Sequence, residues 1–421
     1  MKIIIVANAY QNSSTPCALR VRSWVMCFLA AGMEVVVIQN AEKKTNRGAD
    51  SHAFDTEKLR IISLDCGQEY WYRKVVFLKK NPLTLPFYRF VAWVYYLLTQ
   101  NLLGKDLLAA FKSASVLDFW AAKTDVVLST SPSFTTVFLA RHIQKKYACR
   151  WIADYRDAWV SAENKHNETH FSRQLYDKIN VRLEQKLMRH AHFLTAVSQG
   201  MVDELRKRLP KKQVFLIENG YDDVLETINF DGSDAAVFRV SYLGSLYADL
   251  AWEQIFFEGF KGFLNQFPDA WVAFYFIGTD PKFILPLMEN RYSFAQKYVH
   301  VLSWLPLVDT LPYLQKTHLL LHISYGQAKG LRTTKTYTYL KVQKPIVFIN
   351  PDGSESQKLI EAYDAGFFAE KSADLTAVLV LFYQQFLERR AIKLDNDSKD
   401  FAPLSRVYQA QKMLELIISL P

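Results

Sequence analysis

Short apolar runs alternate with amphipathic stretches along nearly the whole chain. The first run, Ile3 to Val6, precedes a polar loop, Asn8 to Pro16, and then a stretch whose apolar residues recur at helical spacing. A second apolar run covers Glu34 to Gln39. A buried strand, a helical crossover and a second buried strand make a parallel βαβ unit, so this opening predicts a doubly wound sheet.

The same alternation continues to the C-terminus. Further strands are predicted at residues 59–64, 125–130, 151–153, 193–197, 214–218, 238–242, 271–277, 299–302, 318–324 and 346–348. Helices are predicted at residues 134–147, 172–190, 201–208, 253–266, 307–314, 336–342, 358–363, 373–387 and 403–420. This order predicts an α/β protein with two doubly wound, Rossmann-like domains, which we place at residues 1–217 and 218–400.

The segment from Leu331 to Phe348 is a candidate anion site. It follows a buried strand and a glycine-containing loop, and Thr333, Thr334 and Lys335 open its short helix. A helix N-terminus with free N–H groups, hydroxyls and a cation attracts phosphate. The alternative is an ordinary capped αβ unit on the surface.

A second group of polar residues follows the strand at 151–153. Asp154, Arg156 and Asp157 come just past its carboxyl end, which is the edge where doubly wound sheets hold their ligands. Two carboxylates beside an arginine form a candidate polar site. The alternative is an ion-pair network that braces a loop.

Composition places the chain among globular proteins. Of its 421 residues, 50% are hydrophobic and 22% are charged, and the net charge of +9 favours acidic partners such as nucleotides, anionic lipid or nucleic acid. We set nucleic acid aside because no nucleic-acid-binding module is recognisable. The four cysteines have no CxxC spacing, which fits a reducing compartment and predicts neither a zinc site nor disulfides.

Membrane-targeting signals are weak in this sequence. The opening apolar run is too short for a signal peptide, and no apolar run is long enough to span a bilayer. Residues 70–105 combine aromatic and basic side chains with two prolines, which is typical of a membrane-interface element. A pair of core helices with basic outer faces is the alternative.

Five segments follow one another along the chain: TSPSFTTVFLARHIQKKYACRWIADYRDAW, LTAVSQGMVDEL, VFLIENGYDD, YLGSL and KTYTYLKVQKPIV. In this order they resemble segments of the GT-B glycosyltransferases, and within them of the retaining family 4 group of bacterial polysaccharide enzymes. The first segment resembles that group's strand–helix–strand ending in W-I-x-D-x-R-D-x-W. The second and third resemble its S-x-G-M and P-N-G-V-D segments. The fourth resembles its glycine turn, and the fifth resembles its K-x-x-E-Y-L-A-x-x-K-P-I segment. The resemblance covers nearly the whole chain apart from roughly residues 40–120.

This resemblance implies two domains that face each other across a cleft, with the final stretch 401–421 packing back on the first. The implied reaction is the transfer of a sugar from a nucleotide-sugar to a hydroxyl acceptor, a glycan or lipid-linked glycan, with anomeric retention and without a metal or other cofactor. The protein would act in the cytoplasm, or peripherally on the inner face of the membrane through residues 70–105.

The residues that the resemblance and the sheet edges assign fall into three groups. Asp154, Asp157 and Arg156 are the catalytic candidates; Ser131 and Asn8 are placed on the acceptor side. The expected donor-binding residues are Gly244, Ser245, Lys335, Thr333, Thr334, Asn219 and Gly220.

The sequence also departs from the family pattern. The usual pair of glutamates, eight positions apart, would fall on Gly330 and Thr338, and the Arg and Lys expected after the glycine turn are missing from residues 244–249. A non-catalytic binding or scaffold subunit that kept the fold and lost these acids is therefore the competing hypothesis.

Overall fold

The structure is a computed structural model, and it describes the following ranges: 1–11, 15–40, 57–64, 111–112, 121–131, 135–159, 171–230, 236–246, 252–324, 332–388, 394, 396 and 398–420. The chain divides into two compact units, Met1–Glu218 with Ala410–Pro421, and Asn219–Gln409. The sequence placed the first boundary one residue earlier and the return to the first domain at residue 401.

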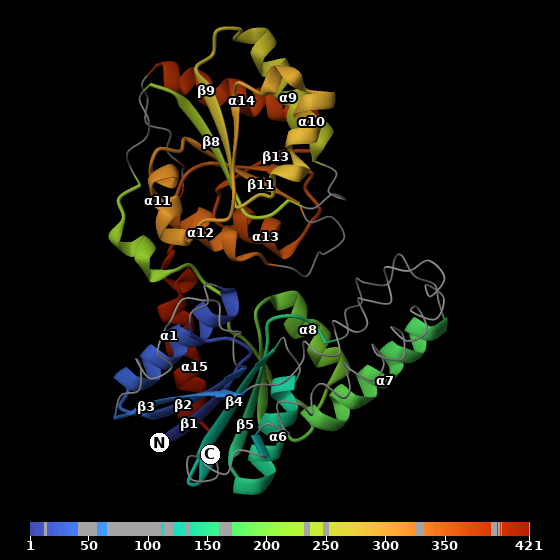
Figure 1. Cartoon of the computed structure of the whole chain (residues 1–421), viewed down its shortest axis with the longest axis vertical. Helices are drawn as coiled ribbons and strands as arrows, with labels where there is room; N and C mark the ends of the chain where they lie inside the picture. Colours follow the sequence, from blue (N-terminus) through green and yellow to red (C-terminus); the bar gives the residue numbers. More distant parts are fainter. Residues whose placement is uncertain are drawn as a thin grey trace. The chain divides into compact units, whose positions relative to one another are not determined.

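The first unit is built on a seven-stranded sheet in which all neighbours run parallel (Figure 1). In spatial order the strands are β3 (Leu59–Leu64), β2 (Glu34–Asn40), β1 (Lys2–Val6), β4 (Val126–Ser131), β5 (Arg150–Tyr155), β6 (Phe193–Ala196) and β7 (Val214–Leu216). The order reverses between β1 and β4, which is where doubly wound sheets open a crevice at the carboxyl ends of their strands.

Helices cover both faces of this sheet because successive strand residues point to opposite sides. Ile3 and Ile5 pack with α1 (Pro16–Ala30) and α15 (Arg406–Ile418). Ile4 and Val6 belong to the opposite layer, which holds α6 (Thr135–Tyr147), α7 (Phe171–Met188) and α8 (Gln199–Arg208). The last helix therefore packs on the first unit through Ala410, Met413 and Ile417.

The second unit repeats this design with six parallel strands. Their spatial order is β10 (Val299–Leu302), β9 (Val272–Ile277), β8 (Phe238–Leu243), β11 (Leu319–Ile323), β12 (Ile346–Ile349) and β13 (Gly366–Ala369). One face carries α9 (Glu253–Gln266), α10 (Leu285–Asn290) and α14 (Ser372–Leu387) over an aromatic core. The other carries α11 (Leu307–Gln315), α12 (Thr334–Val342) and α13 (Glu355–Ala362).

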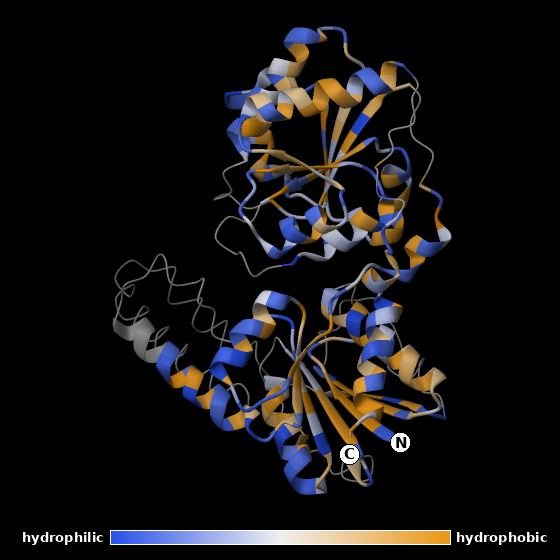
Figure 2. Ribbon diagram, turned by 180° about the vertical axis from the view of Figure 1, so that it is seen from behind, coloured by the Kyte–Doolittle hydropathy of each residue, from blue (hydrophilic) through white to orange (hydrophobic). Residues whose placement is uncertain are grey.

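Short 3₁₀ turns at Asp223–Thr227, Pro281–Phe283, Ser293–Ala295 and Ala402–Leu404 complete the described elements. Figure 2 shows apolar strands inside each unit and mixed, polar outer faces on the helices. Among the described residues, no helix is long and apolar enough to cross a membrane. The basic aromatic segment 70–105 lies outside the described residues, so its predicted membrane contact stays a prediction.

The predicted fold of two doubly wound domains is confirmed. The sequence missed β13, a four-residue strand that is largely half-exposed and therefore gives little hydrophobic signal. It also began α13 three residues late. Ser354 accepts a hydrogen bond from the backbone N–H of Gln357, so the Ser-x-x-Gln spacing marks the true start of that helix.

At Gly220 and Tyr221 the start of the second unit lies directly against the end of the same unit. The N–H of Tyr221 donates to the Leu404 carbonyl at 2.8 Å, and the N–H of Arg406 donates to the Tyr221 carbonyl at 3.1 Å. Gly220 has φ +69°, and a Cβ there would lie 2.7 Å from the Arg406 nitrogen. This close approach of two backbone segments explains why glycine stands here, whatever part the residue has in binding.

We predict that Gly220→Ala lowers the free energy of unfolding of the second unit by about 3 kcal/mol or more, through left-handed strain plus the backbone clash. The matched control is Gly353→Ala, which has the same φ of +69° and nothing within 4 Å. It should lower that free energy by only about 1–2 kcal/mol. Thermal and urea denaturation give both values, and equal losses would contradict the proposed clash.

Candidate functional site

The best candidate site in the second unit lies at the carboxyl ends of β8 and β11, where the strand order reverses. The turn Gly244–Ser245 follows β8 directly, and α12 is the next helix after β11. The crevice of a doubly wound sheet opens at this place. The structure thus brings three predicted donor-binding residues, Gly244, Ser245 and Lys335, to one sheet edge.

Lys335 is the central group of this edge. Its side chain leaves the first turn of α12 and is buried, and its Nζ donates a 2.8 Å hydrogen bond to the Tyr242 hydroxyl. The same ammonium lies 4.0 Å from the centre of the Tyr242 ring. Burial lowers the pKa of Lys335 to about 7, because removing an ammonium from water disfavours its charged form.

The glycine turn is shaped to receive this lysine. Gly244 has φ +116°, and a Cβ on it would lie 3.5 Å from the Lys335 Nζ, so the ammonium lies against the turn. The Gly244 N–H donates to the Ile277 carbonyl at 2.8 Å, and its carbonyl accepts from the Thr279 hydroxyl at 2.8 Å. The Tyr242 hydroxyl donates to the Ser245 carbonyl at 3.0 Å. These bonds fix the turn and the lysine together.

Buried hydroxyls anchor the start of α12. The Thr333 N–H donates to Ser356 Oγ at 3.2 Å, and the Thr333 hydroxyl lies 3.0 Å from that of Thr336. Among the described residues, Thr333 makes no side-chain hydrogen bond to the helix amides that it precedes. Thr333 and the neighbouring Thr334 are half-buried, so the helix N-terminus is both held in place and partly open.

His322 completes the network beneath the helix. Its Nε2 lies 3.2 Å from the Thr336 hydroxyl, and its ring stacks on Phe348 at 4.5 Å. Burial, and then the Lys335 ammonium, lower the pKa of His322 well below its usual value, so the imidazole is neutral at pH 7. The positive charge at this edge therefore comes from Lys335 rather than from the histidine.

In the first unit, Asp154 is buried within a dense hydrogen-bond network. It is 1% exposed, and its carboxylate accepts from Arg20 at 2.8 and 3.2 Å, from Thr130 at 2.8 Å and from Thr195 at 2.7 Å. Arg20 also donates to the carbonyls of Ile217 and Glu218. Asp154 therefore orients Arg20, which holds the end of this unit, and the ion pair is with Arg20 rather than with Arg156.

The remaining candidates of the first unit lie nearer the surface. Asp157 is exposed and Arg156 is half-buried; desolvation raises the pKa of Asp157 and Arg156 opposes that rise. Asn8 is exposed just after β1, whereas Ser131 at the end of β4 is buried and accepts the Arg156 N–H at its carbonyl. Asn8 and Ser131 thus flank the reversal point of the sheet, one strand away from Arg156 and Asp157.

Asn219 and Gly220 lie at the opening of the second unit, well before β8 in the chain, and the contacts of Gly220 there are to Ser405 and Arg406. Sequence reasoning missed Tyr242, His322 and Arg20. Each is a polar side chain in an otherwise apolar stretch, which is the signal that could have found them. Among the described residues, no group of three or more His, Cys, Asp or Glu could hold a metal ion.

Comparison with known proteins agrees with this architecture. Residues 17–220 match the family described as the glycosyl transferase 4-like domain, which is most of the first unit. No curated protein matches the chain in sequence.

Solved structures match over the whole length. Sucrose-phosphate synthase from Thermosynechococcus elongatus has a TM-score of 0.61 at 14% identity, covering 99% of this chain and 98% of that chain. HepE from Anabaena, in complex with UDP and glucose, has a TM-score of 0.61 at 14% identity, covering 100% of both chains. A putative UDP-N-acetylglucosamine 2-epimerase from Listeria monocytogenes has a TM-score of 0.57 at 13% identity, covering 99% of this chain and 96% of that chain.

The class that these findings define is the GT-B fold, with two Rossmann-like domains of parallel strands. Within the chain, residues 17–220 match the glycosyl transferase 4-like domain. Of these two findings, the family match is the one that points to a transferase. Since an epimerase has a similar structure, the fold alone does not select the reaction.

We predict that Asp154→Asn lowers the free energy of unfolding of the first unit by about 3–5 kcal/mol, because it leaves the buried Arg20 charge without its carboxylate. Asp157→Asn is the matched control, since it makes the same chemical change at an exposed position. Asp157→Asn should lower the free energy of unfolding by less than about 0.5 kcal/mol. Melting curves measure both, and an Asp154→Asn variant as stable as the Asp157→Asn variant would remove the structural role of this pair.

Proposed function

We propose that this protein transfers a sugar from a UDP-sugar donor to a hydroxyl acceptor. The observation that carries the proposal is the Lys335 ammonium, buried against the Gly244 turn at the reversal point of the second sheet. Such a place suits the diphosphate of a nucleotide-sugar. The HepE structure, which is in complex with UDP and glucose, supports UDP as the nucleotide.

The chemistry needs a positive group beside the leaving diphosphate, because negative charge develops there as the glycosidic bond breaks. Lys335 supplies a full charge when it is protonated, and the N-terminus of α12 adds its partial positive charge. Tyr242 holds the lysine in position through its hydroxyl. Binding of the diphosphate would restore the charge of an ammonium whose burial disfavours it.

The acceptor side would lie at the corresponding edge of the first unit. Asp157 is exposed there and can accept a proton from, or orient, an acceptor hydroxyl, with Arg156 beside it. Asn8 and Ser131 flank the adjacent reversal point. We propose a glycan or lipid-linked glycan of the cell surface as the acceptor, anomeric retention, no metal requirement, and contact with an anionic membrane through residues 70–105.

A non-catalytic sugar-nucleotide-binding subunit is the second candidate. It is favoured by Thr338, which stands where family enzymes carry a glutamate and is buried on α12. A threonine hydroxyl can accept a hydrogen bond from a sugar but cannot supply a negative charge. Such a subunit would bind UDP and turn over nothing.

The direct test is release of UDP from a panel of UDP-sugars, with and without glycan acceptors. A transferase releases UDP and forms a glycoside, and nuclear magnetic resonance of the product reads its anomeric configuration. Epimerisation would change the donor sugar without stoichiometric UDP release. UDP binding without any turnover would support the binding subunit instead.

We predict that Lys335→Ala weakens UDP binding by roughly ten- to a hundredfold, the loss of one charge-assisted hydrogen bond of about 1.5–3 kcal/mol. Uridine, which lacks the diphosphate, should bind both proteins alike. Lys316→Ala, at an exposed lysine of the same unit, is the matched control and should bind UDP as the wild type does. Calorimetry that finds equal UDP affinity in all three proteins would remove Lys335 from the site.

We also predict that UDP affinity falls as the pH rises from about 7 to 9. The free Lys335 side chain has its pKa lowered to about 7, and a bound diphosphate raises it again, so binding takes up a proton above pH 7. The diphosphate of UDP changes its ionisation little in this range, since its last phosphate pKa is near 6. The affinity of Lys335→Ala should be flat over the same range, and a flat wild-type profile would contradict the assignment.

A further inference from the structure

A cluster of basic side chains surrounds the amino ends of the strands in the first unit, at the edge opposite to the candidate acceptor residues. Its residues come from α6, the start of β5, the segment between α7 and β6, the end of α8, and the turn before β7. We call it the amino-edge basic surface; its members are Arg141, Arg150, Arg189, His190, His192, Arg206 and Lys212.

The contacts of these residues place them close together. Arg189 Nε donates to His190 Nε2 at 3.0 Å, and the Lys212 ammonium donates to the Ala191 carbonyl. The Trp151 N–H, next to Arg150, donates to His192 Nδ1 at 3.3 Å. The segment that carries the two histidines thus lies between the start of β5 and the turn before β7.

Like charges act on one another across this surface. Desolvation, and then Arg141, Arg189 and Lys212, lower the pKa of His190. Desolvation, and then Arg150 and Lys212, lower the pKa of His192. Among the described residues, no ion pair joins any member of the surface to a carboxylate. The nearby carboxylates of Glu184 and Glu204 pair with Arg208, which is not a member.

Part of this charge has a local cause. The helices that connect parallel strands end at the amino edge, and a cation in the last turn of a helix is stabilised by the helix dipole. Arg206 in α8 is such a cation. Arg150, His192 and Lys212 lie outside the last turns of the helices, so dipole compensation does not account for them. Uncompensated repulsion of this kind is expected at a binding surface.

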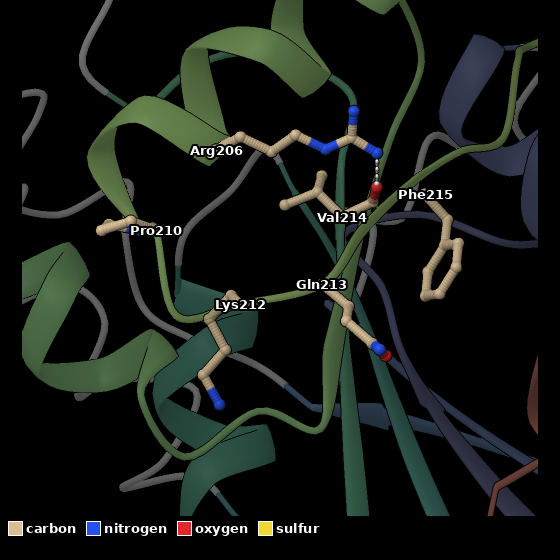
Figure 3. A pocket seen from close by; sticks show the side chains of 6 residues that line it. All are labelled: Arg206, Pro210, Lys212, Gln213, Val214 and Phe215. Atoms are coloured by element: carbon tan, nitrogen blue, oxygen red, sulfur yellow. Dashed lines mark hydrogen bonds between the residues drawn. The ribbon is translucent and has the colours of Figure 1, made fainter.

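The basic surface also contains an open hollow. It has a volume of about 420 Å³ and is lined by Arg206, Pro210, Lys212, Gln213, Val214 and Phe215, shown in Figure 3. Its lining therefore mixes apolar side chains with two cations. β7 is the last strand in the sheet order. Arg206 donates a 2.9 Å hydrogen bond to the Val214 carbonyl of β7, so this backbone acceptor is already occupied. A partner would consequently meet side chains here rather than add a strand.

We propose that the amino-edge basic surface binds an acidic segment of another protein, and that an apolar side chain of that segment enters the hollow. Cations around a partly apolar depression complement alternating carboxylates and apolar groups. A flat lipid surface would leave the hollow unused.

The position of the surface also favours a protein partner. β4 has six residues, so its two ends are about 16–20 Å apart at roughly 3.3 Å per residue. A partner on the amino edge leaves the carboxyl edge of the sheet, where Asn8 and Ser131 lie, uncovered. The inference does not depend on the proposed sugar transfer, because it uses no residue of that site.

The test uses the full chain and two acidic peptides of about twelve residues, identical except that one has a central leucine and the other a serine. At low salt, where surface charges are least screened, both should bind and the leucine peptide more tightly. Arg189→Glu with Arg206→Glu should weaken binding of both peptides by about tenfold or more. Lys261→Glu with Lys316→Glu, exposed lysines of the second unit, makes the same change in net charge and should alter affinity by less than about twofold.

Several results would overturn the proposal. Equal losses in the two double variants would mean that only net charge matters, and equal affinity for the two peptides would exclude the hollow. Vesicles with about 30% phosphatidylserine that bind through this surface more tightly than either peptide would identify a membrane contact instead. If the Glu variant has a lower melting temperature than wild type, Arg189→Gln with Arg206→Gln replaces it, and unchanged peptide affinity in that variant also contradicts the proposal.

Discussion

Burial of the Lys335 ammonium is the interaction on which the candidate donor site depends. An ammonium loses much of its hydration when it leaves water, and here it recovers part of that loss from the Tyr242 hydroxyl and ring. The glycine turn allows this arrangement, because Gly244 presents no side chain to the lysine. In the proposed function, a diphosphate that reaches this place would stabilise the charged form of Lys335, which burial disfavours.

The first unit uses a buried charge differently. The Asp154 carboxylate accepts hydrogen bonds from Arg20, Thr130 and Thr195. Arg20 in turn donates to the carbonyls at residues 217 and 218, so the buried ion pair also fixes the end of the first unit. Here the charges of Arg20 and Asp154 pair with each other inside the protein, so neither charge is left to bind a ligand. The contrast separates Asp154, whose charge is paired inside the protein, from Lys335, for which we propose a role in binding the donor.

Much of the fold could be predicted from the sequence, because strands buried on both faces give continuous apolar runs such as Ile3 to Val6. The half-exposed β13 lacks such a run and was missed. The order of strand, loop and helix predicted that Lys335 would lie at the sheet edge, and the resemblance supplied Gly244, whereas the contact between them is seen only in the structure. The role of Asp154 did not, since its partner Arg20 lies 134 residues away and only the assembled sheet brings them together.

The central claim, that the edge formed by β8 and β11 holds the donor diphosphate, can be tested by hydrogen exchange of the full chain with and without UDP. Bound diphosphate should slow exchange of the backbone amides at residues 242–246 and 333–338 and leave those of Val214–Leu216 in the first unit unchanged. UDP binding that protects other segments while these two ranges exchange as in the free protein would contradict the account.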